Sequence, residues 1–307
     1  MNAPDKVRAD IPPGGPAQTP QSRARFCTSE NPFRFTYPAV PARQFLAERD
    51  QAFDPAAPTS TVALDAAADL GTPYPATTPT LLCRYFRIRA GEQLHTGFIA
   101  TSEVFYVMRG DGESSGGSES IAWGAGDVLC LPSGGIVHRA RTDAVLFGVS
   151  DEPILAFEGL RPPPADRPAV KPTHWPATEI DRNFQRVWAR PRTPETTGCS
   201  VMFSCQDFAP GYHTTPMINT AINTLEAGGD QRPHRHNGVA VTLAIEGEGV
   251  HSMIEGTRVD WSNGAAQITP AALLHSHHNR GTKRMRSFVI QDEGLHYYTR
   301  TPGFSFG

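Results

Sequence analysis

Three histidines in the second half of the sequence have the spacing of metal ligands. His234 and His236 are separated by one residue, and His275 lies five residues after Pro270. Residues i and i+2 of a strand face the same side, so the first two imidazoles would point into a barrel together. A third imidazole from the strand pair after Pro270 would complete one face of a coordination sphere and leave positions open for substrate and oxygen. The spacing therefore predicts one divalent metal ion, for which imidazole suits iron, copper, nickel or zinc.

Polar side chains near these histidines are candidates for substrate contacts. Asn219 and Asn223 share one face of the strand expected before the histidine pair. Gln267 lies on the strand that leads to Pro270. Buried asparagines also serve simply to satisfy backbone groups, so both roles stay open for Asn219 and Asn223.

Short β-rich runs must position these residues. Runs such as TLLCRYFRIRA, EVFYVMRG, DVLCLP, AVTLAIEGEG, AAQITP and RSFVIQ are bounded by Gly, Pro or Asp. They have the composition and spacing of antiparallel strands in a sandwich or barrel, so we expect a mainly β fold. Gly110 to His138 and Gly247 to His275 are both 28 residues apart. This repeat predicts two tandem barrels, with His138 matched to His275.

Composition divides the chain into four expected segments. Residues 1–30 are rich in Pro, Gly, Ala and Gln and are expected to form a flexible tail, because they offer little apolar surface to bury. A Pro-rich stretch predicts a linker over 161–190, since proline removes backbone donors and favours extended structure. The expected barrels are 31–160 and 191–307.

The motifs resemble those of the cupin superfamily. Its patterns G-x5-H-x-H-x3-4-E-x6-G and G-x5-P-x-G-x2-H-x3-N match Gly228, His234, His236 and Gly247, and then Gly264, Pro270, His275 and Asn279. The resemblance implies two double-stranded β-helix (jelly-roll) barrels, that is, a bicupin. The position of the usual glutamate ligand falls at Ala240 or Val241 here, neither of which binds metal.

A centre of three neutral histidines is similar to that of the gentisate and salicylate 1,2-dioxygenase cupins. That resemblance implies Fe²⁺ at His234, His236 and His275, with Mn, Ni or Zn as alternatives. It implies a catalytic contact from His277 to substrate or bound oxygen, although His277 can also be read as a rim histidine. Three neutral ligands keep the full charge of the ion, which favours chelation by an anionic substrate.

The implied activity is that of a non-haem iron, extradiol-type dioxygenase that cleaves the ring of a hydroxylated aromatic compound with dioxygen. One departure weakens the substrate assignment. The position at which related enzymes carry an arginine for the substrate carboxylate is Thr242 here, which we keep as a substrate-binding candidate. Aminophenols, thiols, diketones and hydroxyketones thereby become credible substrates. The sequence does not select among the possible replacements Arg190, Arg192, Arg284 and Arg286.

Two other function classes stay open. A metal-dependent lyase, isomerase or hydrolase would use the ion as a Lewis acid with His277 as base. A binding cupin would have no turnover, since fold alone does not fix function.

The first half keeps only part of the cupin pattern. His95, Glu103 and His138 are potential ligands, but both histidines are about one residue out of place. A shift of one residue turns a side chain to the opposite face of a strand, so we expect a degenerate barrel that packs against the active one.

Charge and hydropathy limit the expected partners. The chain has 28 Lys and Arg and 31 Asp and Glu residues in no long runs, which does not favour nucleic acid. It lacks a secretory signal and a long apolar segment, so we expect a cytoplasmic protein without membrane contact. A small anionic substrate and a homo-oligomer, dimer or tetramer, are the expected partners.

Overall fold

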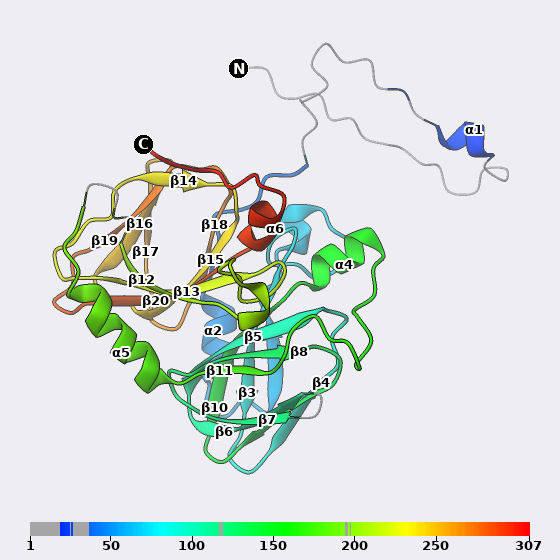
Figure 1. The fold of residues 1–307 in the computed structure, drawn as a ribbon, viewed down its shortest axis with the longest axis horizontal. Coiled ribbons are helices and arrows are strands. Elements are labelled where there is room, and N and C mark those ends of the chain that lie inside the picture. The colour runs from blue at the N-terminus through cyan, green and yellow to red at the C-terminus, as the bar shows by residue number, and fades with distance from the viewer. Residues whose placement is uncertain (1–18, 25, 27–36, 117–118, 194–195, 197) are drawn as a thin grey trace. The chain divides into compact units, whose positions relative to one another are not determined.

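Short strands, many of them with buried side chains, form most of the regular secondary structure, as the β-rich runs predict (Figure 1). The computed structural model describes residues 19–24, 26, 37–116, 119–193, 196 and 198–307. The chain divides into the units Met1–Tyr37 and Pro38–Gly307. The described part of the first unit contains the single turn α1 (Pro20–Arg23), capped by the Thr19 hydroxyl. Most of the expected tail, 1–30, lies outside the described residues.

The first barrel is built from a six-stranded and a four-stranded antiparallel sheet. The six-stranded sheet has the order β11 (Thr173–Trp175), β8 (Val128–Pro132), β5 (Ser102–Arg109), β10 (Ala144–Ser150), β3 (Leu82–Ile88) and β2 (Ser60–Ala63). The four-stranded sheet has the order β4 (Gln93–Thr96), β9 (Ile136–Ala140), β6 (Asp111–Gly116) and β7 (Glu119–Gly124).

The second barrel repeats this plan with a six-stranded and a five-stranded sheet. The six-stranded sheet has the order β1 (Gln44–Phe45), β18 (Ala266–Thr269), β15 (Ala240–Glu246), β20 (Met285–Gln291), β13 (Asn219–Leu225) and β12 (Cys199–Phe203). The five-stranded sheet has the order β17 (Thr257–Asp260), β16 (Val250–Ile254), β19 (His275–Asn279), β14 (His234–His236) and β21 (Phe304–Phe306). The expected class, mainly β with two tandem cupin-type barrels, is confirmed.

Short helices flank the strands. They are α2 (Leu46–Phe53), α3 (Ala67–Leu70), α4 (Glu152–Glu158), α5 (Ala177–Trp188), the 3-10 turn η1 (Gln206–Phe208) and α6 (Glu293–Tyr298). The 12-residue helix α5 lies inside the segment expected to be a linker. Its buried residues Ile180 and Phe184 are four positions apart and so lie on one helix face, a helical period that the surrounding prolines obscure in the sequence.

Each six-stranded sheet ends in an edge strand from outside the range expected for its barrel. Gln44 and Phe45 of β1 pair with Gln267 and Ala266 in the second barrel. In the other direction β11, from the Pro-rich stretch, pairs with β8 in the first barrel. The second barrel therefore includes a strand that precedes the first barrel in the sequence, and the first barrel includes a strand from the Pro-rich stretch. The boundaries 31–160, 161–190 and 191–307 remain predictions.

A single apolar core joins the two six-stranded sheets. It contains buried residues of both halves, among them Phe147 and Val149 from the first and Ile222 and Ile290 from the second. Tyr106 stacks on Phe288 with ring centroids 5.4 Å apart. Burial of this much apolar surface stabilises the pair of barrels as one unit.

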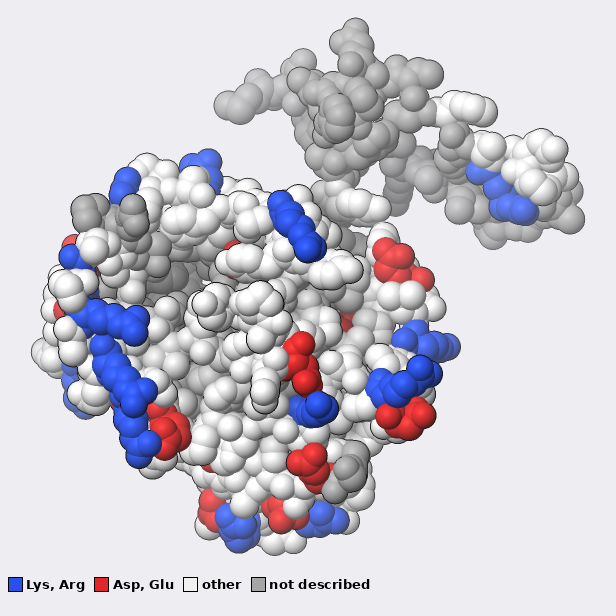
Figure 2. Space-filling model, in the orientation of Figure 1, with Lys and Arg blue, Asp and Glu red and all other residues white. Residues whose placement is uncertain are grey.

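Charges of both signs lie on the surface. On the face drawn in Figure 2, a row of Lys and Arg side chains follows the edge that carries α5, and others lie with Asp and Glu around the rest of the molecule. Among the described residues, no helix is both long enough and apolar enough to cross a membrane.

The interior of the first barrel is closed and apolar. His138 is fully buried against Phe86 and Phe105, whose ring centroids lie 5.6 and 4.8 Å from its own. Glu103 is also buried, whereas His95 is exposed on β4. The one-residue shift thus turns His95 outward, and these three residues do not form a ligand cluster.

The internal repeat has a different register from the one expected. Ser114 on β6 lies opposite His138 and bonds its Nδ1 at 2.7 Å, and the Trp123 indole donates to the same hydroxyl at 2.8 Å. In the second barrel the same three roles belong to Ser252, His277 and Trp261. His138 therefore corresponds to His277, and the match to His275 that equal spacing predicted is wrong. Strand pairing, and not the number of residues between two positions, decides which face of the sheet a side chain lies on.

A testable consequence concerns Glu103. Burial raises the pKa of its carboxyl from 4.5 to about 8, against the opposing hydrogen bond from Ser133. The folded protein then binds one more proton than the unfolded chain between these values, so this contribution to stability is full below pH 4.5 and is lost as pH rises. Relative to Glu103→Gln, the wild-type free energy of unfolding should fall by up to about 1.4 kcal/mol per pH unit across this range. The free energy of unfolding of both proteins can be measured by urea unfolding at several pH values. If it changed with pH in the same way in both, Glu103 would not be a neutral buried acid.

Candidate metal centre

Strands β14 and β19 bring the three predicted ligands together. His234 and His275 are directly opposed in the antiparallel pair, and His236 is two residues along on the same face. One ring nitrogen from each of the three imidazoles lies within 4.8 Å of those of the other two. All three side chains are buried, and Arg235 between them is exposed. This is the one such group of three or more metal-binding side chains among the residues that the structure describes.

Backbone carbonyls fix the protonation of the three rings. Each Nδ1 lies at hydrogen-bond distance from a carbonyl oxygen, which can only accept, so each Nδ1 carries the proton. The acceptors for His234, His236 and His275 are Arg232, Gly238 and Leu273, at 3.0, 2.8 and 2.9 Å. Each Nε2 is consequently left with a free lone pair, the form in which imidazole binds a metal.

Burial keeps the three rings neutral. Desolvation lowers the pKa of His236 to about 4 and that of His275 to about 3, and it also lowers the pKa of His234. A metal ion needs unprotonated nitrogen, so these rings are ready to bind one near neutral pH. The donor set therefore fits a divalent transition metal with imidazole ligands.

The expected absence of a carboxylate ligand agrees with the strand register. Ala240 begins β15 and lies opposite Gln291 and Thr269, and its methyl group offers no donor. The nearest acidic group is Glu293 at the start of α6, whose Oε1 is 3.9 Å from His236 Nδ1. Burial raises the pKa of Glu293 to about 7, so this carboxyl is only partly ionised near neutral pH.

His277 belongs to a buried hydrogen-bond network beside the three histidines. Its ring centroid is 6.0 Å from that of His275. The Ser252 hydroxyl accepts N–H groups from Trp261 at 2.8 Å and Gln267 at 2.7 Å. Its one proton is then directed at His277 Nδ1, 2.9 Å away, which leaves His277 with its proton on Nε2. His277 thus has the opposite tautomer to the three other rings and is a hydrogen-bond donor.

The remaining predicted residues lie on the same inner face of the second barrel. Thr242 and Gln267 are cross-strand partners and are both buried. Asn223 and His277 line one small cavity of about 40 Å³. Asn219 is buried, and its Oδ1 has no hydrogen-bond partner within the described part of the chain.

Residue counting alone missed other groups next to the histidines. The amide nitrogen of Gln291, at the end of β20, is 3.1 Å from His236 Nε2. Phe304 on β21 packs beside His234, with ring centroids 5.5 Å apart. The polar Gln291 at the end of the run RSFVIQ was a signal in the sequence, whereas nothing there indicates that Phe304 returns to β14.

Three of the four arginines considered for a substrate carboxylate are engaged elsewhere. Arg192 and Arg284 pair with Glu226, and Arg286 pairs with Asp181 at 2.9 Å. Arg284 and Arg286 also lie over aromatic rings of α5. These contacts hold the guanidinium groups of Arg284 and Arg286 against α5, and Arg192 is engaged by Glu226.

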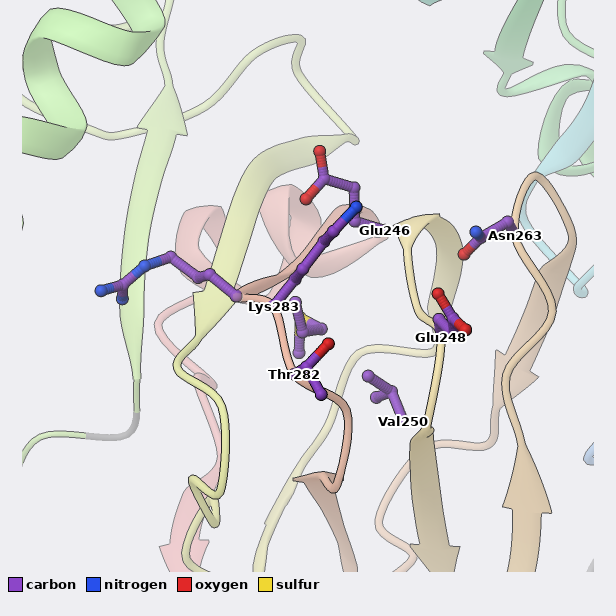
Figure 3. Close-up of a pocket in the computed structure, with 8 residues that line it drawn as sticks. Glu246, Glu248, Val250, Asn263, Thr282 and Lys283 are labelled. Atoms are coloured by element: carbon purple, nitrogen blue, oxygen red, sulfur yellow. The ribbon is translucent and has the colours of Figure 1, made fainter.

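Another cavity lies at the far end of β15 from Ala240. It measures about 180 Å³ and is lined by the ends of the loops after β15 and β19. In Figure 3, Lys283 is drawn beside Glu246, and Glu248 and Asn263 lie on the opposite side of the cavity. Its charged mouth is separated from the histidines by the length of the strand, so it is not part of the metal centre.

Comparison with known proteins gives the family of this barrel. Residues 221–291 match the family model of the cupin domain. A 5-aminosalicylate 1,2-dioxygenase from Comamonas sp. is 31% identical over 86 residues, which are 27% of this chain and 23% of the relative. A gentisate 1,2-dioxygenase from Ralstonia sp. is 34% identical over 65 residues, which are 21% of this chain and 18% of the relative. The matched segments thus span less than a quarter of these two relatives.

Solved structures agree over a much longer part of the chain. The salicylate 1,2-dioxygenase of Pseudaminobacter salicylatoxidans superposes with a TM-score of 0.71 at 13% identity, covering 91% of this chain and 92% of that one. A cupin 2 conserved barrel domain protein from Leptotrichia buccalis has a TM-score of 0.51 at 13% identity, covering 84% and 98%. Residues 221–291 therefore match the cupin domain, within a chain that shares the fold of the salicylate dioxygenase structures.

Proposed function

We propose that this protein is an Fe²⁺-dependent, ring-cleaving dioxygenase that acts on a hydroxylated aromatic compound of the gentisate or salicylate kind. The observation that carries the proposal is the set of three neutral imidazoles with unprotonated Nε2 atoms, a ligand group that includes no carboxylate among the described residues. The names of the relatives, which include a gentisate and a 5-aminosalicylate 1,2-dioxygenase, support the same chemistry.

His234, His236 and His275 would hold the metal through Nε2. A ferrous ion held there would supply the redox chemistry that joins the substrate to dioxygen. Three neutral ligands leave its charge uncompensated in a buried site, which favours a substrate that brings anionic oxygens. Hydroxylated aromatic acids and related phenols fit this requirement. The ring cleavage that we propose for them is of the extradiol type.

The other inner side chains would orient the substrate. His277 donates from Nε2 to a substrate or oxygen atom, since Ser252 holds its Nδ1. Thr242 stands where related enzymes carry the arginine for the substrate carboxylate, and Asn219, Asn223 and Gln267 supply polar contacts on the same face. The ion pairs of Arg192, Arg284 and Arg286 favour substrates held by hydroxyl or amino groups, such as aminophenols.

A Lewis-acid lyase, isomerase or hydrolase is the second candidate. The observation that favours it is the missing carboxylate-binding arginine, because a diketone or hydroxyketone needs no such partner. Such an enzyme would turn over without dioxygen.

The oligomeric state, a dimer or tetramer, remains a prediction.

Oxygen uptake decides between the two candidates. We expect protein purified without oxygen and loaded with Fe²⁺ to consume dioxygen with gentisate, salicylates or aminophenols in an oxygen electrode. The apoprotein is the control and should consume none. Substrate loss under anaerobic conditions would instead support the Lewis-acid candidate.

Removal of one ligand should abolish the centre. In His234→Ala and His275→Ala we expect metal affinity to fall by at least about 100-fold, since each loses one of three protein nitrogens. Metal analysis after dialysis measures this. His174→Ala is the control, because His174 pairs with Asp127 in the first barrel at 2.9 Å. Stoichiometric metal in both ligand variants would refute the assignment.

His277 should affect turnover more than metal binding. We expect His277→Ala to keep one ion per chain and to lower kcat by about 10- to 100-fold, the usual effect of removing a group that orients metal-bound species. His251→Ala is a matched control, since His251 stacks on His278, which pairs with the exposed Asp230. Unchanged kinetics in His277→Ala would remove His277 from the mechanism.

A further inference from the structure

Gln291 occupies a row of three facing residues at the level of the metal centre. It is the last residue of β20 and lies opposite Ala240 of β15 on one side and Asn219 of β13 on the other. Directly opposed residues project to the same face of a sheet, with Cβ atoms about 5 Å apart. The amide of Gln291 therefore shares the inner face with Ala240 and Asn219.

The Gln291 amide reaches the lone pair that a metal would use. Its Nε2 is 3.1 Å from His236 Nε2. His236 Nδ1 donates to the Gly238 carbonyl, so His236 Nε2 can only accept, and the amide N–H of Gln291 is the donor. This hydrogen bond places the end of the Gln291 side chain beside the three imidazoles.

Its backbone is held at this level. Asp292 Oδ1 accepts the N–H of Val239 at 2.8 Å, and Asp292 Oδ2 accepts the hydroxyl of Thr80, from the first barrel, at 2.6 Å. Val239 and Asp292 are the sequence neighbours of Ala240 and Gln291. These bonds clamp the adjoining ends of β15 and β20 together, so the position of Gln291 relative to the histidines is well defined.

The first barrel offers an internal comparison. In both barrels the paired strands have an irregularity near one end, at Val145/Leu146 and at Ala244/Glu246. Four residues along the strands from this irregularity, each barrel has an equivalent pair of facing residues. The pair is Glu103 and Ser150 in the first barrel and Ala240 and Gln291 in the second. Each barrel therefore has one long polar side chain and one short side chain at this level, with the two strands exchanged.

From this geometry we propose that Gln291 is a fourth, neutral protein ligand to the metal that the three histidines hold. The inference rests on the proposed metal site and adds a residue to it. A half-turn of the terminal amide exchanges Nε2 for Oε1, which releases the His236 lone pair and presents a carbonyl oxygen instead. The buried Asn219 Oδ1, which has no partner among the described residues, is then available to the displaced amide N–H.

A neutral oxygen ligand has a specific chemical consequence. It fills one position without reducing the charge of the ion, unlike the carboxylate that Ala240 replaces in the usual cupin pattern. It also binds more weakly than a carboxylate, so an anionic substrate can displace it. The centre then stays occupied by protein before the substrate arrives.

The sign of a change in metal affinity tests the proposal. Co²⁺ is titrated into the apoprotein in competition with a chromophoric chelator, and the visible absorption of the bound ion is recorded. For Gln291→Leu we expect about 10-fold weaker binding and shifted absorption bands, and for Gln291→Glu about 10-fold tighter binding. Gln267→Leu is the matched control, a buried glutamine in the same barrel that donates to Ser252 and not to a ligand histidine. Its affinity and bands should match the wild type.

Unchanged or tighter Co²⁺ binding in Gln291→Leu would overturn the proposal. The Gln291 amide would then only compete with the metal ion for the lone pair of His236 Nε2. Should Gln291→Leu fail to fold, the absence of tighter binding and of a band shift in Gln291→Glu would do the same. Oxygen uptake by the wild type together with a Gln291-independent affinity refutes this inference alone. Gln291-dependent affinity without oxygen uptake refutes only the proposed dioxygenase activity. A wild type that binds no metal refutes both.

Discussion

The metal centre depends on the donation of three Nδ1–H groups to backbone carbonyls. Without these bonds each imidazole could carry its proton on either nitrogen, and the three rings would have no common lone-pair direction. The carbonyls belong to residues within two positions of their histidines, so the short strands β14 and β19 and their adjoining turns orient their own ligands. Burial then favours the neutral rings over the protonated ones.

The two barrels use one framework for different interiors. Both contain a tryptophan that donates to a serine, which in turn bonds the Nδ1 of a histidine. In the first barrel that histidine, His138, ends against phenylalanine rings with its Nε2 unpartnered among the described residues. In the second, His277 lies beside three imidazoles. The shared network stabilises the barrel in both cases, and the residues around it decide whether the interior is a packed core or a binding site.

The neutral character of the three imidazoles bears on which ligands a bound metal ion would favour. Three imidazoles and the buried side chains of Asn219 and Gln267 supply dipoles without charge, and Glu293 is only partly ionised near neutral pH. In a buried environment an ion of charge +2 is poorly compensated by such groups, so a chelating anion gains more binding energy there than at the surface. The first barrel supports this arrangement from outside, through the common core and the bond from Thr80 to Asp292.

The sequence by itself determined the fold class, the duplication and the three candidate ligands, because these follow from local rules. The period of two along a strand places His234 and His236 on one face, and Gly and Pro at fixed offsets mark the turns between strands. It did not determine the register between strands, so it matched His138 to the wrong histidine and left Gln291 unnoticed. It also missed α5, whose helical period is short and lies among prolines. Only the tertiary structure brought Ala240, Gln291 and Asn219 into one row and engaged Arg192, Arg284 and Arg286 in ion pairs, because pairing between distant strands depends on the packing of the whole barrel.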